Sequence, residues 1–139
     1  MKVRTAAFWT IVTLFAALLL AGCSPQEPGS ALKQVQQQRS GDYVITVLND
    51  TGSLKKGANS FTLEFRKAAD NQLADPGNVE VKPMMEMAGM APMMATCQVK
   101  AGAKPGQFDV TTELGMAGSW KFHMTYGQGQ QADIDLSAR

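Results

Sequence analysis

The chain has few of the residues that carry most enzymatic chemistry. Among its 139 residues are one histidine and two cysteines, and aromatic side chains make up only 7%. A nucleophile–base pair is therefore hard to assemble, and no paired carboxylates stand out, so we expect no enzymatic activity. Two cysteines are too few for a disulfide framework. Thirteen basic and 12 acidic residues nearly cancel, which argues against a nucleic-acid partner, because such proteins carry a basic stripe.

The N-terminal residues have the organisation of a bacterial lipoprotein signal. Lys2 and Arg4 precede an apolar run over residues 8–20, and the last residue of this run begins the sequence Leu20-Ala21-Gly22-Cys23. A run this short with a small-residue end is typical of a secretory signal and not of a membrane-spanning helix. The four residues 20–23 resemble the lipobox, a motif in which the cysteine is acylated. We predict a signal peptide over residues 1–22 and attachment to the lipid bilayer through acylated Cys23; a plain signal peptide or an uncleaved anchor are the alternatives.

The predicted anchor places the chain in the bacterial cell envelope, facing the periplasm. Ser24 follows the cysteine, and by resemblance to lipoprotein sorting patterns this favours the outer membrane. Residues 24–41 are polar and show no apolar period. We therefore predict that residues 23–41 are the lipidated cysteine and a flexible linker. A short helix through Leu32 and Val35 is the alternative. Acylation of Cys23 would leave Cys97 without a disulfide partner in the chain.

From residue 42 onward, apolar side chains alternate with polar ones. Seven short runs show this period, which is typical of half-buried strands, and Gly, Pro, Asn and Asp punctuate the gaps between them. The runs cover residues 43–47, 61–65, 79–81, 97–99, 108–114, 120–126 and 132–136. Each strand has one apolar face, so a second sheet must cover it. We predict an all-β fold, a seven-stranded immunoglobulin-like antiparallel β-sandwich, over residues 42–139. The alternation places Cys97 and Met124 inside and His123 on the polar side.

Methionine is the residue in excess, and it is concentrated in one segment. Residues 83–95 read PMMEMAGMAPMMA, where Gly89 and Pro92 disfavour a regular strand or helix. We predict a loop between the third and fourth strands. Its thioethers are soft ligands that lose no proton on binding, so the segment predicts a Cu(I) site. The candidate ligands are Met84, Met85, Met87, Met90, Met93 and Met94. A Met-rich docking surface and plain packing remain open as alternatives.

Met116 is a seventh candidate ligand on topological grounds. If successive strands reverse direction, the loops at 49–59, 83–95 and 115–118 fall at one end of the domain. The turn that carries Met116 then lies beside the methionine segment. An equally open alternative is that Met116 caps the core beside Trp120.

Three stretches of the chain resemble the YtkA-like domain. They read LKKGANSFTLEFR, DNQLADPGNVEVKPMMEMAGM and KPGQFDVTTELGMAGSWKFHMTYG, and together they lie within residues 54–127. The resemblance implies a periplasmic or extracellular β-sandwich in the style of FixH and CopC proteins. It also implies attachment to a membrane and work beside copper-efflux or cytochrome oxidase assembly proteins. The family's methionine loop matches residues 84–94, its turn methionine matches Met116, and its turn tryptophan matches Trp120.

The methionine loop differs from that of many relatives in having no histidine, which favours Cu(I) over Cu(II) or zinc. We expect a membrane-anchored Cu(I)-binding protein that holds copper or delivers it to an efflux or oxidase-assembly membrane protein. The alternative is an interaction domain that binds no metal and docks a membrane protein through its methionine loop.

Overall fold

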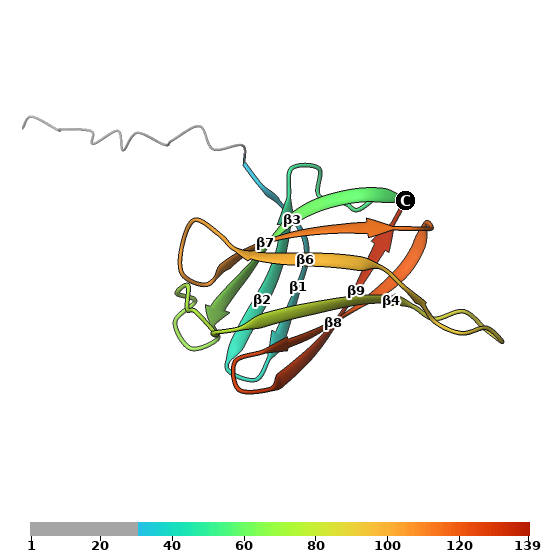
Figure 1. The fold of residues 1–139 in the computed structure, drawn as a ribbon. Coiled ribbons are helices and arrows are strands. Elements are labelled where there is room, and N and C mark those ends of the chain that lie inside the picture. Colours follow the sequence, from blue (N-terminus) through green and yellow to red (C-terminus); the bar gives the residue numbers. More distant parts are fainter. Residues whose placement is uncertain (1–30) are drawn as a thin grey trace, which may run out of the picture.

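The computed structural model describes residues 31–139. The predicted signal peptide and Cys23 lie outside the described residues. Within residues 31–139, the regular secondary structure consists of nine β-strands and contains no helix (Figure 1). The strands are β1 (Lys33–Ser40), β2 (Tyr43–Asn49), β3 (Gly57–Lys67), β4 (Val79–Met85), β5 (Met93–Met94), β6 (Thr96–Ala101), β7 (Gln107–Leu114), β8 (Gly118–Tyr126) and β9 (Gln130–Ala138). This part of the chain contains no helix of the length and apolarity that crossing a bilayer requires.

The strands form two antiparallel sheets packed face to face. One sheet has the order β1-β2-β3-β7-β6 and the other the order β5-β4-β8-β9. The chain passes from the first sheet to the second after β3 and again after β7, and it returns to the first between β5 and β6. The predicted all-β sandwich is therefore confirmed. The seven predicted runs correspond to β2, β3, β4, β6, β7, β8 and β9, and the structure adds β1 and β5.

Strand β1 corrects the predicted linker. Lys33–Ser40 pairs antiparallel with β2, so the folded domain begins at about Lys33 and not at residue 42. Nearly all side chains of β1 are exposed, and only Val35 packs on the core. An edge strand with two polar faces has no alternation, which is why the sequence pattern failed to predict it. The Tyr126 hydroxyl donates a hydrogen bond to the Ser40 carbonyl oxygen at 3.2 Å and so ties β1 to the other sheet.

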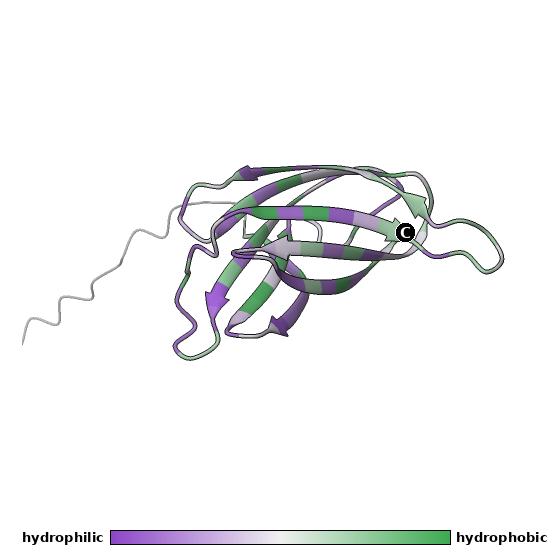
Figure 2. Ribbon diagram, turned by 60° about the horizontal axis from the view of Figure 1, so that its bottom comes forward, coloured by the Kyte–Doolittle hydropathy of each residue, from purple (hydrophilic) through white to green (hydrophobic). Residues whose placement is uncertain are grey.

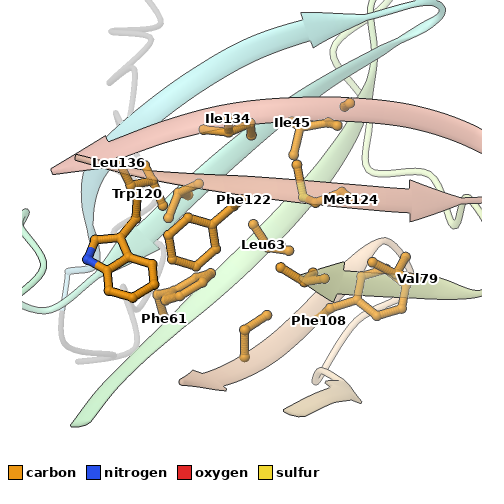
Figure 3. Packing of buried hydrophobic residues seen from close by; sticks show 14 of the residues in the cluster. Ile45, Phe61, Leu63, Val79, Phe108, Trp120, Phe122, Met124, Ile134 and Leu136 are labelled. Atoms are coloured by element: carbon orange, nitrogen blue, oxygen red, sulfur yellow. The ribbon is translucent and has the colours of Figure 1, made fainter. Parts of the chain in front are cut away.

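Hydrophilic and hydrophobic residues alternate along the strands (Figure 2). The hydrophobic side chains of both sheets meet in one core (Figure 3). Phe61 from β3 and Phe122 from β8 pack edge to face with ring centroids 5.8 Å apart, which joins the two sheets. Burying each such side chain stabilises the fold by about 1.5–3 kcal/mol. Met124 is buried in this core, as the alternation predicted. His123 lies on the opposite face of β8, where its Nδ1 is 2.5 Å from Oδ1 of Asp133 on β9.

Candidate functional site

The methionine segment forms a hairpin that extends beyond the sheets (Figure 1). Met84 pairs with Met94 and Met85 pairs with Met93, so the loop prediction is wrong at both ends of the segment. It is correct for residues 86–92, which form the tip. The Met90 amide donates to the Met87 carbonyl oxygen at 3.2 Å, and the Gly89 between them has φ +74°, which a tight turn of this kind needs.

Strand geometry divides the paired methionines between two faces of the hairpin. Met85 continues the inward face of β4 and is only 7% exposed. Met93, directly opposite, is half-buried and packs against the core. Met84 and Met94 point to the other face, since neighbouring residues of a strand alternate. Met84 is half-buried and Met94 is 57% exposed.

The two remaining methionines of the hairpin lie in its tip. Met87 is half-buried and packs against the core, on the same side as the inward pair. Met90, at the end of the turn, is 67% exposed and is the most exposed large apolar side chain of residues 31–139. The hairpin therefore presents sulfur atoms in three settings: inward, outward and at the tip.

The turn between β7 and β8 lies against the inward methionines. A Cβ atom at Gly115 would lie 3.5 Å from Sδ of Met93, and one at Gly118 would lie 3.0 Å from Cε of Met85. These two glycines belong to the candidate site, and the sequence reasoning missed them. Their pattern around Met116, Gly-Met-Ala-Gly, was the available signal, because small residues permit a close approach. Met116 is thus at the hairpin end of the domain, as the strand directions predicted.

Met116 itself contributes to the turn in two ways. Its carbonyl oxygen accepts a hydrogen bond from Nε1 of the fully buried Trp120 at 3.0 Å, which fixes the turn on the core. Its side chain is 43% exposed. The thioether of Met116 is therefore available to a ligand at the same end as Met85, Met87 and Met93. We call these four residues the end cluster, and Met84 with Met94 the outer pair.

The donor atoms at this end are almost all neutral sulfur. Within residues 31–139, no three His, Cys, Asp or Glu side chains come together as they do in a hard-metal site. Glu86 is the acid of the hairpin, and its carboxylate lies 3.4 Å from Nζ of Lys121, so its charge is balanced. Soft, uncharged ligands suit a soft monovalent ion and discriminate against Ca²⁺, Mg²⁺ and other hard cations.

Cys97 and His123 are not among the residues of the end cluster. Cys97 on β6 is half-buried and lines a groove of about 430 Å³ between β4 and β6, which Met94 also borders. Burial raises the pKa of its thiol to about 11, so the thiol is protonated at neutral pH. His123 is paired with Asp133 and lies opposite Lys82 on β4.

Comparison with known proteins agrees with the resemblance seen in the sequence. The family model described as YtkA-like matches residues 37–125. The match includes the whole hairpin, the turn between β7 and β8, and all strands from β2 to β7. No curated protein matches the chain. Since the matched residues make up well over half of the chain, it belongs to the YtkA-like family.

Proposed function

We propose that this protein binds Cu(I) through methionine thioethers at the hairpin end of its sandwich and holds the ion for a membrane partner. The partner is a copper-efflux or oxidase-assembly protein. The lipobox-like ending at Cys23 supports attachment to the bacterial envelope, with the domain in the periplasm. Membership of the YtkA-like family supports the same location. The protein carries cargo and catalyses no reaction.

One observation carries the proposal: two separate segments place methionines at one end of the fold. The hairpin supplies Met85, Met87 and Met93, and the turn that packs on Met85 and Met93 supplies Met116. Packing alone does not require so many thioethers, because Met specifies a core poorly. The exposed sulfur atoms would also be open to oxidation, a cost that a metal-binding role explains.

Thioether ligands suit transfer of the ion between proteins. Each sulfur is neutral whether or not it is bound, so the ion can move without proton release. Ligands on a hairpin that projects from the sheets can be replaced one at a time by those of a partner. Met90, at the tip, is placed to make the first contact with such a partner.

The test is a competition titration with a chromogenic Cu(I) chelator, under anaerobic and reducing conditions. Replacing Met87, Met93 and Met116 together by Leu should weaken Cu(I) binding at least tenfold, because Leu keeps the volume but has no sulfur donor. Met124→Leu is the matched control, since Met124 is buried in the core away from this end. The proposal fails if the triple variant binds Cu(I) as tightly as the wild type.

Docking without metal is the second candidate function. The exposed Met90 and Met94 favour it, because they leave flexible apolar surface on a projecting hairpin. The same variant separates the two functions. Leucine retains apolar contact area, so docking to a membrane partner should survive the triple replacement, whereas tight copper binding should not.

A further inference from the structure

The outer pair, Met84 and Met94, has a geometry of its own. The two residues are directly opposite in the ladder between β4 and β5. Both lie on the face of the hairpin opposite to Met85 and Met93. Met94 also borders the groove that Cys97 lines. We propose that the outer pair is a second, weaker Cu(I) site, separate from the end cluster, where the ion is exchanged. This inference rests on the proposed function.

The strand register keeps the two sites apart. Side chains directly opposite in an antiparallel pair have Cβ atoms about 4.5–5.5 Å apart, so two flexible thioethers there can close on one ion. Met85 and Met93 leave the same backbone in the opposite direction, and the hairpin itself stands between the two sets of sulfur atoms. The Ala95 amide donates to the Pro83 carbonyl oxygen at 3.0 Å and extends the ladder beside the outer pair, which holds this register.

The two sites differ in exposure and in the number of ligands. Met94 is largely exposed and Met84 is half-buried, whereas Met85 in the end cluster is buried. An ion on the outer pair keeps contact with water and has two protein ligands. The end cluster offers up to four thioethers, some of them shielded by the turn that carries Met116. We therefore expect weaker binding and faster exchange at the outer pair.

The charges around the outer pair permit a monovalent cation. Lys121 on β8 is opposite Met84, and its ammonium lies 3.4 Å from the Glu86 carboxylate. Lys82, two residues before Met84, lies 3.9 Å from the Glu80 carboxylate. Each ammonium near the pair thus has an acidic partner. The surface around Met84 and Met94 is close to neutral, and an added single positive charge meets little repulsion.

The experiment uses Ag(I), a soft monovalent ion that is stable in air. Native mass spectrometry counts bound ions on the purified protein, and NMR of ¹³C-methyl-labelled methionine follows each thioether. The wild type should bind two ions. Met84→Leu with Met94→Leu should remove the weaker one, and replacement of Met87, Met93 and Met116 by Leu should remove the tighter one. In the wild type, the Met84 and Met94 methyl signals should move together, and at higher Ag(I) than the end-cluster signals.

The outcomes separate this inference from the proposed function. A wild type that binds no Ag(I) and no Cu(I) overturns both. A wild type that binds one ion overturns only the second site. So does a Met84→Leu and Met94→Leu variant that keeps the wild-type number of ions. The two leucines replace partly exposed side chains on the hairpin, so the sandwich core is unchanged in this variant.

Discussion

Cys97 illustrates how burial sets the chemistry of a single residue. The alternation of β6 directs it inward with Val99, as the sequence predicted, and the structure leaves it half-buried beside the edge of β4. Apolar neighbours such as Val79 and Val81 offer no charge to stabilise a thiolate. The pKa of the thiol rises from 9.0 to about 11 because burial disfavours the charged form.

We expect Cys97 to react slowly with iodoacetamide at pH 8. A pKa about two units above that of a free thiol lowers the thiolate fraction about 100-fold. The difference in labelling between the wild type and Cys97→Ser isolates this residue.

The same raised pKa makes the stability of the fold depend on pH. Between pH 9 and pH 11 the unfolded chain loses the thiol proton while the folded chain keeps it, so the free energy of unfolding falls as pH rises.

The same variant tests whether Cys97 takes part in metal binding. Cys97→Ser should bind Cu(I) with wild-type affinity, because the neutral thiol lies outside the end cluster. Rapid labelling of Cys97 at pH 8 would contradict the raised pKa. A loss of Cu(I) affinity in Cys97→Ser would add Cys97 to the ligands.

At the scale of the elements, the hairpin and the turn between β7 and β8 depend on one another. Gly118 has φ +137°, a conformation that side chains rarely adopt, and a Cβ there would press on Cε of Met85. Gly118→Ala should therefore lower the free energy of unfolding by about 1–3 kcal/mol through backbone strain alone. The displaced Met85 should also weaken Cu(I) binding. Urea denaturation and the chelator titration measure the two effects.

Gly129→Ala is the matched control for this prediction. Gly129 also has positive φ, +101°, but a Cβ there would meet nothing within 4 Å, and it lies in the turn between β8 and β9. The Gly129→Ala variant should also have a lower free energy of unfolding, because of the same kind of backbone strain, but its Cu(I) affinity should be unchanged. Equal effects of the two variants on affinity would mean that the contact between Gly118 and Met85 does not organise the site.

The sequence predicted the elements that have one apolar face and missed those that do not. Alternation identifies β8 and β9, for example, because one face of each is buried in the core and the other is more exposed. It fails for β1, which is exposed on both faces, and for β5, which has two residues. The inward direction of Met85 follows from extending the alternation of β4. The pairing of Met84 with Met94 could not be predicted in this way, because it depends on the length and geometry of the tip of the hairpin.

At the scale of the whole molecule, topology brings the site together. We predicted that the hairpin and the turn with Met116 lie at one end of the domain, and this remains correct although the structure has two more strands, β1 and β5. Strand β1 precedes the first predicted loop, and β5 lies within the methionine segment, so neither changes the order of the later loops. Leu54 forms an isolated β-bridge with Ala138, and Ala138 also pairs with Gly118 at the start of β8. The loop before β3, which contains Leu54, therefore lies at this end as well. Residues far apart in the sequence thus form one surface only when the sandwich is folded.

This dependence on folding predicts how a bound ion affects stability. An ion that binds only the folded chain raises the free energy of unfolding, by about 2.7 kcal/mol at 100 times its dissociation constant. The hairpin methionines remain close in sequence after unfolding and retain some affinity, which reduces the gain. Met116 joins them only in the fold. Thermal denaturation with excess Ag(I) should therefore show a clear rise in Tm for the wild type.

Two exposed methionines, Met116 and Met90, should differ in how much they contribute to this rise in Tm. Met116→Leu should lose more of the Ag(I)-induced rise in Tm than Met90→Leu, because Met116 comes from a separate segment that only the fold brings to the hairpin. Without metal, both variants should melt near the wild type, since each side chain is exposed. An equal rise in Tm for Met116→Leu and the wild type would show that the hairpin binds the ion alone, and that the sandwich serves only to display it.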